Sequence, residues 1–278
     1  MKNAVRKTLI ACAVTASFAA SSGAMAQTFP DFTVNEGAIA GALGQTFTAD
    51  KITGNYVEVI TFAGSETSGT FNVSLKWNAG QFVADNGATP VASQLGSVTS
   101  NQYGLYALYQ GTGTYSTSQS GTVFNFAPGG SLSLFADANS NTQFVQPENG
   151  NTAFGTTGNS DDVLIANGVP TSGQGVLDPS LSTCGNGGIN CGSFGASSTF
   201  NLTAAGSEYF VAPNPFYNIS FQSGQLNNFT PTGTQVINGS LDVIFGGTSE
   251  VPEPASVALL GLGFAGLALS RRRRAKQA

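Results

Sequence analysis

The sequence has 278 residues, few charges and no histidine, and this composition excludes several classes of protein. Charged residues make up 9% of the chain, and between residues 27 and 254 two lysines stand against fifteen acidic residues. A body with this negative balance cannot bind nucleic acid by neutralising phosphates. Without histidine there is no Ser-His-Asp hydrolase. The abundance of Gly, Ser, Thr and Asn favours an extracellular β-rich protein over a cytosolic enzyme.

Residues 1–26 have the pattern of a secretory signal peptide. Basic residues occur at positions 2, 6 and 7, and an apolar run covers residues 9–20. Ala24 and Ala26 then form a small-x-small cleavage motif, which predicts a mature chain that starts at Gln27. We therefore expect the body to cross the inner membrane.

The body, residues 27–250, consists of short alternating segments separated by turn residues. The clearest are residues 56–62 and 70–77, with residues 64–69 as a hairpin loop between them. Phe71 and Trp77 share one face of the second segment, as in a strand with one buried face. Further candidate strands are residues 104–110, 122–126, 131–135, 142–145, 163–166, 198–202, 216–221 and 235–245.

These segments predict an all-β domain. Gly and Pro interrupt the chain too often for long helices, and roughly ten short strands at this spacing favour a β-sandwich or jelly-roll-like fold. The register of residues 235–245 is left open, because a bulge near Gly239 would change it. Residues 146–195 are rich in Gly, Asn and Ser, so we expect long loops there.

The mature chain keeps two cysteines, Cys184 and Cys191, with six residues between them in a Gly- and Asn-rich stretch. This spacing predicts a local disulfide that closes a turn-rich loop in an oxidising compartment. The alternatives are a metal site and a redox pair. A zinc site would lack further His or Cys ligands, and the spacing is not Cys-x-x-Cys.

One stretch has the spacing of a calcium loop. Asp137, Asn139 and Asn141 place oxygen atoms at every second residue, and Glu148 stands at the twelfth position. The glycine expected in the middle of such a loop is replaced by Thr142. The alternative is a solvated Asx-rich turn without a cation, and no other cofactor is expected.

The C-terminal stretch, residues 251–278, combines three features. Pro252-Glu253-Pro254 should be extended and accessible, because proline fixes φ and removes a backbone donor. Residues 255–269 are uncharged and would form a single short transmembrane helix of ~22 Å against a ~30 Å hydrocarbon core. Arg271, Arg272, Arg273 and Arg274 should stay on the cytoplasmic side. The alternative is a buried core helix with a solvated basic end.

In this order, the three features resemble the PEP-CTERM sorting signal of Gram-negative bacteria that make exopolysaccharide. The resemblance implies that an exosortase, a membrane-embedded cysteine protease, recognises Pro252-Glu253-Pro254 and removes the tail. The inner membrane would then hold the chain only transiently, before the body reaches the cell surface or extracellular matrix.

With its Trp77 strand, its Cys184–Cys191 loop and the sorting tail, the body resembles the flocculation-associated PEP-CTERM proteins. This resemblance implies a non-catalytic role with exopolysaccharide in flocculation, cell aggregation or biofilm formation. One alternative is a lectin-like module, for which Trp77, Tyr103, Tyr106 and Tyr109 are the candidate aromatic platform. The other is a secreted glycan-active enzyme, although nothing in the sequence pairs two carboxylates for that chemistry.

Overall fold

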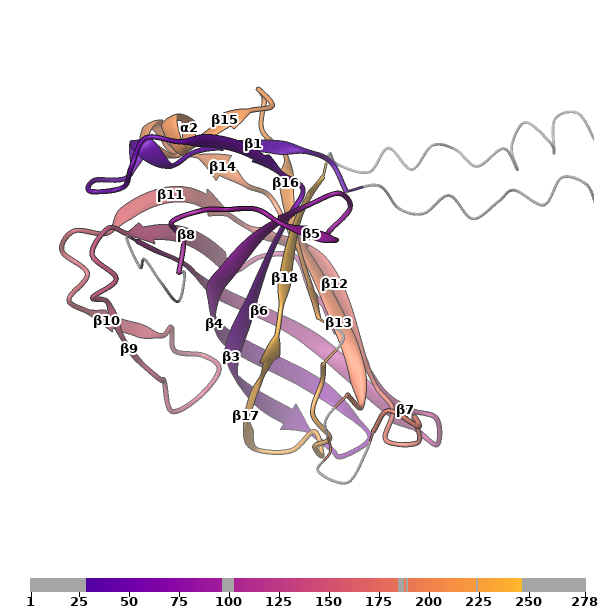
Figure 1. The fold of residues 1–278 in the computed structure, drawn as a ribbon. Coiled ribbons are helices and arrows are strands. Elements are labelled where there is room, and N and C mark those ends of the chain that lie inside the picture. The colour runs from indigo at the N-terminus through magenta and orange to yellow at the C-terminus, as the bar shows by residue number, and fades with distance from the viewer. Residues whose placement is uncertain (1–28, 97–102, 185–187, 189, 224, 247–278) are drawn as a thin grey trace, which may run out of the picture.

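The computed structural model describes residues 29–96, 103–184, 188, 190–223 and 225–246 (Figure 1). The predicted signal peptide, the Pro-Glu-Pro tripeptide, the apolar helix and the arginine cluster lie outside the described residues. Among the described residues, no helix is long and apolar enough to cross a membrane.

The centre of the molecule is a closed antiparallel barrel of eight strands. In order around the barrel these strands are β3 (Lys51–Gly64), β4 (Ser68–Ala84), β6 (Gly104–Ser118), β7 (Gly121–Phe126), β12 (Pro170–Leu177), β13 (Gly192–Ser198), β16 (Asn218–Ser223) and β18 (Asp242–Gly246). The strand β17 (Thr234–Ser240) pairs with β3 next to the β18 contact.

The long strand β4 closes the barrel, because it pairs along one edge with β3 and along the other with β6. Leu75 lies opposite Glu58 on the first side and opposite Tyr109 on the second. Directly opposed residues of paired strands face the same side of a sheet. Glu58, Leu75 and Tyr109 therefore form one row on the inner face of the barrel wall.

Smaller elements cover one end and one side of the barrel (Figure 1). At the top of the view is a three-stranded sheet of β15, β1 and β2, which packs with a short helix α2. Strand β8 pairs with β6 outside the barrel, and β11 and β14 continue the sheet from β8. Strand β5 pairs with β4, and β9 pairs with β10. Their bounds are β1 Phe32–Asn35, the 3-10 helix η1 Glu36–Ala38, β2 Thr46–Ala49, β5 Thr89–Pro90, β8 Ser131–Asp137, β9 Gln143–Val145, β10 Gly155–Thr157, β11 Val163–Gly168, β14 Asn201–Leu202, α2 Ala204–Tyr209 and β15 Phe210–Ala212.

The all-β prediction is confirmed, whereas the predicted β-sandwich or jelly roll is wrong and is replaced by the closed barrel. Alternation along a strand reports only that one face is buried, and sandwiches and barrels share that property. Closure depends on the second edge of β4, which joins residues 68–78 to residues 106–116. No short sequence pattern records such a pairing.

The predicted hairpin of residues 56–62 and 70–77 is present, and both strands are longer than expected. Phe71, Val73, Leu75 and Trp77 are all buried on the predicted face. The segment 235–245 is broken at Leu241, whose backbone N–H donates to Gly54 O. The predicted strand 198–202 is not one strand: it covers the last residue of β13, two residues outside any strand, and β14.

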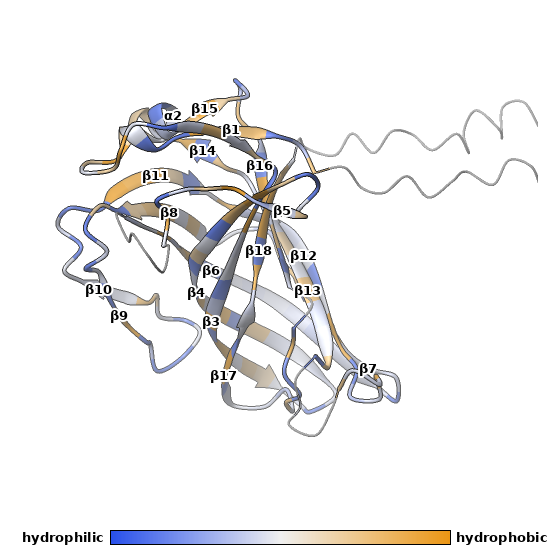
Figure 2. Ribbon diagram, in the orientation of Figure 1, coloured by the Kyte–Doolittle hydropathy of each residue, from blue (hydrophilic) through white to orange (hydrophobic). Residues whose placement is uncertain are grey.

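The prediction of long loops over residues 146–195 is wrong in part, because this range holds β10, β11, β12 and the start of β13. Strand β12 has the sequence PTSGQGVL and is drawn largely pale in Figure 2. Its glycines Gly173 and Gly175 have no side chain to contribute to an alternating pattern. They instead leave room for rings, since Cβ atoms there would contact Phe126, Phe124 and Phe194.

Glycines in the wall make space for aromatic side chains in the lumen. A Cβ at Gly113 of β6 would overlap the ring of Phe71 and the carbonyl oxygen of Asn125. Phe71 packs edge-on against Phe126, with ring centroids 5.1 Å apart. Aromatic rings thus fill much of the lumen and pack against the glycine positions of the wall.

We predict that Gly113→Ala lowers the free energy of unfolding by about 2 kcal/mol or more, because an added methyl group in a filled core forces its neighbours apart. Gly44→Ala is the matched control, since nothing lies within 4 Å of a Cβ there. Urea unfolding followed by the fluorescence of Trp77 measures both variants. Equal stability of the two variants would contradict the packing described here.

Candidate functional site

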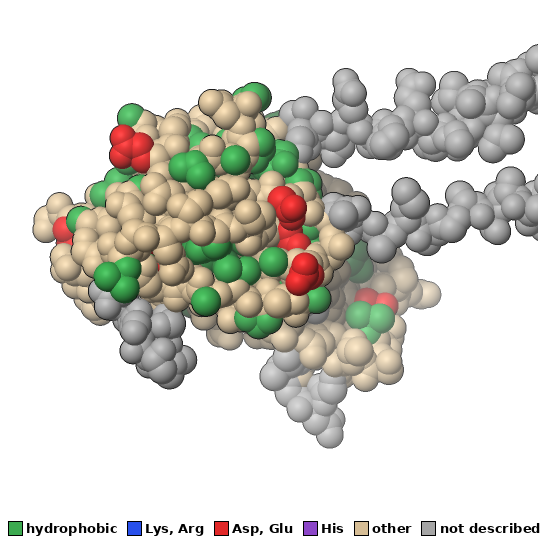
Figure 3. Space-filling model, turned by 45° about the horizontal axis from the view of Figure 1, so that its top comes forward, with side chains coloured by type: hydrophobic (Ala, Val, Ile, Leu, Met, Phe, Trp, Pro, Cys, Tyr) green, Lys and Arg blue, Asp and Glu red, His purple; other side chains and the backbone are tan. Residues whose placement is uncertain are grey.

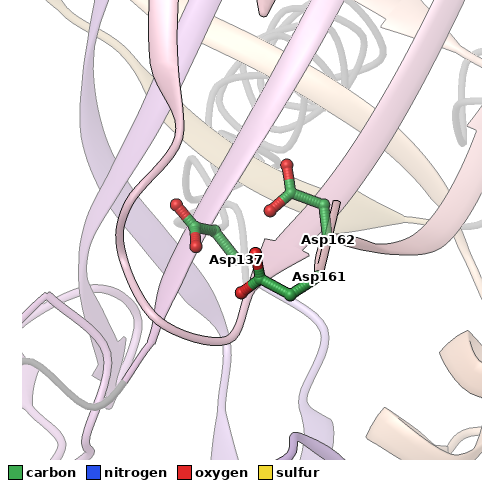
Figure 4. Close-up of side chains that lie close together, drawn as sticks. All are labelled: Asp137, Asp161 and Asp162. Atoms are coloured by element: carbon green, nitrogen blue, oxygen red, sulfur yellow. The ribbon is translucent and has the colours of Figure 1, made fainter. Parts of the chain in front are cut away.

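Three aspartates converge where β8 and β11 meet. Asp137 ends β8, and Asp161 and Asp162 directly precede β11. These strands are antiparallel with Val163 opposite Ala136, so the end of one lies beside the start of the other. Carboxylate oxygens of the three residues lie within 4.8 Å of one another (Figure 4). A group of hard oxygen ligands at this spacing is suited to Ca²⁺.

Each of these carboxylates also has a partner within the protein. The Asp137 carboxylate accepts hydrogen bonds from the backbone N–H groups of Asn141 and Thr142, at 3.2 and 2.9 Å. Asp162 accepts from the hydroxyls of Thr142 and Tyr106. Burial, followed by the Asp162 contact, raises the pKa of Tyr106 above its usual value.

The predicted calcium ligands are therefore only partly brought together. Asn139 joins the group through its amide, which donates to Asp161 at 2.8 Å. Asn141 contributes its backbone N–H, and the exposed Glu148 is not part of the group. Asp161 and Asp162 were missed because they lie more than twenty residues further along the chain. The adjacent acids just before a candidate strand at 163–166 were the available signal.

The predicted disulfide between Cys184 and Cys191 is present, with an Sγ–Sγ distance of 2.01 Å. It closes the connection between β12 and β13. Backbone hydrogen bonds tie the end of this connection to the segment that follows β16: Cys191 N donates to Leu226 O at 2.8 Å, and Leu226 N donates to Gly192 O at 3.1 Å. The disulfide thus braces the end of the barrel where that segment lies.

The four rings proposed as a lectin platform do not form one. Trp77, Tyr103, Tyr106 and Tyr109 are all buried. The Trp77 Nε1–H donates to Leu241 O at 2.8 Å, and the Tyr103 hydroxyl donates to the buried Glu36 at 2.8 Å. These side chains belong to the core and cannot stack on a sugar at the surface.

The outer wall offers a polar groove instead. Strands β13, β16 and β18 line a hollow of about 570 Å³ with the side chains of Ser193, Ser197, Ser220, Gln222 and Asp242. Asp242 also pairs with Lys51 at 3.0 Å. On the face drawn in Figure 3, the charged side chains that can be seen are acidic and lie scattered among hydrophobic side chains and the tan of the backbone and other side chains.

Glu58 is a buried carboxyl inside the barrel. It is 4% exposed, and burial raises its pKa to about 8. It contrasts with Glu36, which is equally buried but accepts from Gln94 N, Gln94 Nε2 and Tyr103 Oη at 2.8 to 3.1 Å. In the described part of the chain, no hydrogen bond reaches the Glu58 carboxyl.

Comparison with protein families finds the PEP-CTERM protein-sorting motif at residues 250–274. The motif implies an exported protein that is processed by an exosortase and attached at the cell surface. No curated protein and no solved structure matches the chain. The motif lies at the C-terminal end of the chain and does not include the barrel.

The calcium site remains a prediction, which a thermal melt can test. Millimolar Ca²⁺ should raise the melting temperature of the exported protein, with a Kd of ~10⁻⁴–10⁻³ M typical of extracellular sites. Asp161→Asn should abolish this rise, because it removes one of the three carboxylates. Asp31→Asn, at an exposed aspartate outside this group, is the control. Identical melting in Ca²⁺ and in EDTA would rule the site out.

The Glu58 pKa predicts a loss of stability with rising pH. An unfolded Glu ionises near pH 4.5, whereas the folded protein keeps the proton up to about pH 8. Unfolding therefore releases a proton between these values, so stability is full below the unfolded pKa and falls until pH passes the folded pKa. Glu58→Gln should remove this slope and be more stable than the parent by about 3 kcal/mol at pH 7, at ~1.4 kcal/mol per pKa unit.

At pH 4 the Glu58→Gln variant and the parent should unfold at the same urea concentration, because both side chains are then neutral. The exposed Glu66→Gln gives the matched carboxyl-to-amide control. An unchanged slope in Glu58→Gln would mean that the carboxyl is hydrated or paired in the folded protein.

Proposed function

We propose that this protein is a non-catalytic surface or matrix component that acts with exopolysaccharide in cell aggregation, flocculation or biofilm formation. The observation that carries the proposal is the sorting motif at residues 250–274, which delivers the body outside the cell. The partners are an exosortase during export and the secreted polysaccharide afterwards.

The character of the exported body supports this proposal. Between residues 27 and 254 it has two basic and fifteen acidic residues, and its outer wall is rich in hydroxyl and amide groups. Hydroxyls, amides and carboxylates are the groups that exchange hydrogen bonds with sugar hydroxyls. The buried rings and the disulfide give the body a rigid frame suited to a structural role.

A lectin-like module is the second candidate, and the groove of β13, β16 and β18 favours it. Ser220 and Gln222 project from β16 into this groove, and Asp242 lies beside them on β18. A cluster of hydroxyl, amide and carboxylate groups can recognise one defined sugar by hydrogen bonds. Saturable binding of a single glycan would distinguish this function from general adhesion to the matrix.

We predict that deletion of the gene disperses flocs without reducing the polysaccharide that the cells secrete. The wild-type gene should restore flocs, and a gene with Pro252→Ala and Pro254→Ala should not, because the exosortase would no longer recognise the tail. Settling rate and total carbohydrate in the culture measure the two effects. Ser249→Ala, next to the motif, is the matched control.

Processing is followed in the same strains by the mass of the exported protein. The double proline variant should accumulate as an uncut chain in the membrane fraction. Intact flocs in the deletion strain would refute the proposed role. Loss of polysaccharide in that strain would point to a role in synthesis instead.

A further inference from the structure

The inner row of Glu58, Leu75 and Tyr109 lies beside two small cavities in the lumen. Glu58 lines both of them, and their volumes are about 20 and 10 Å³. The Tyr109 hydroxyl, at the second cavity, is buried and has no hydrogen-bond partner among the described residues. The Tyr109 hydroxyl and the Glu58 carboxyl thus line the same cavity without a hydrogen bond to the described part of the chain, although buried polar groups ordinarily have a partner.

The two cavities together are called the chamber below. Apart from Glu58 and Tyr109, the side chains that line it are apolar, and many are aromatic. Phe126 and Phe194 are the two residues besides Glu58 that line both cavities. The larger cavity is also lined by Phe71, Phe124 and Phe229. An apolar pocket with one or two polar groups is typical of a site for a small molecule, and barrel interiors are a common place for it.

No cation faces Glu58 among the side chains that line the two cavities. The titratable groups coupled to it are Tyr56 on its own strand and Tyr109 on β6, and burial raises the pKa of both hydroxyls, which keeps them neutral. Lys76 of β4 points outward and lies over the Phe144 ring at 4.6 Å. The lining residues from β7, β12, β13, β16 and β17 carry no charge. A positive charge would have to come from a ligand.

The segment of residues 225–233 contributes Leu226 and Phe229 to the wall of the larger cavity. Its Phe229 ring lies against Phe62 and Phe124, with centroids 5.9 and 5.8 Å apart. Backbone hydrogen bonds hold the segment, among them Asn228 N to Gly188 O at 2.7 Å. Each cavity alone has room for about one water molecule. Movement of the Phe229 side chain would add the volume of one phenyl ring.

We propose that the lumen binds a small apolar amine, whose ammonium group pairs with the Glu58 carboxylate and whose hydrocarbon body replaces the Phe229 ring. The surrounding rings stabilise the cation through their faces, and the ion pair removes the cost of an unpaired buried charge. The inference is independent of the surface role proposed above, because it concerns the barrel interior.

Benzylamine is the probe, because it carries one phenyl ring and one ammonium group. Calorimetric titration of the processed, exported protein should detect its binding. Benzoate, with the same ring and the opposite charge, should not bind, and toluene should bind less tightly. Binding at pH 7 should release a proton from Glu58, which is measured as a heat that depends on the ionisation enthalpy of the buffer.

Two variants locate the site. Glu58→Gln should weaken benzylamine binding about tenfold or more, whereas the surface variant Glu66→Gln should leave it unchanged. Phe229→Ala should strengthen it about tenfold, since the ring no longer competes with the ligand. If Phe229→Ala does not fold, Phe229→Leu tests the same point with a smaller gain in volume.

Benzylamine binding that is unaffected by Glu58→Gln would overturn the proposal. It would also be overturned if benzoate or toluene bound as tightly as benzylamine, because the carboxyl would then make no contribution. Absence of any benzylamine binding by the parent protein and by the folded Phe229 variant would exclude a ligand chamber.

Discussion

Closure of the barrel through β4 is the constraint on which the rest of the structure depends. Because β4 pairs with β3 on one edge and β6 on the other, the eight strands share one lumen. A lumen of this width must be filled by side chains or by a ligand. Large rings fill it here, and glycines such as Gly113 and Gly175 leave the space that those rings need. The composition of the wall therefore follows from closure.

Glu58 is the exception to this filling, and its position explains why it is costly. Its neighbours across the strands, Leu75 and Ile237, are both buried, so the pairing of β3 with β4 and β17 fixes the carboxyl in the lumen. A one-residue slip would move it outside but would expose Tyr56 and Ile60 as well. The register that buries the rings thus also buries the carboxyl. Burying Glu58 in its neutral form costs less free energy than exposing Tyr56 and Ile60 would.

Sequence reasoning located much of the strand content but not the barrel. Alternation identified residues 70–77 and their buried face correctly, because that face is continuous over four large side chains. It failed at β12, where glycines carry no periodic signal. The aromatic platform of the lectin alternative is absent because Tyr103, Tyr106 and Tyr109 are buried by long-range packing, which no local pattern records. Asp137 was found and Asp161 was not, because strand pairing brings them together. The pairing of Cys184 with Cys191 was predicted correctly because the two residues lie close together in the sequence.

The sorting motif and the barrel place different demands on the chain. The motif begins at residue 250, and the last strand of the barrel, β18, ends at Gly246, so the barrel is complete four residues before the matched region begins. The barrel requires strands from both halves of the chain, since β18 pairs with β3 at Ile52 and Lys51. The last strand of the body must therefore be in place before the lumen is closed. The PEP-CTERM motif begins at residue 250, close to this final strand, so folding of the body and processing by the exosortase concern adjacent segments of the chain.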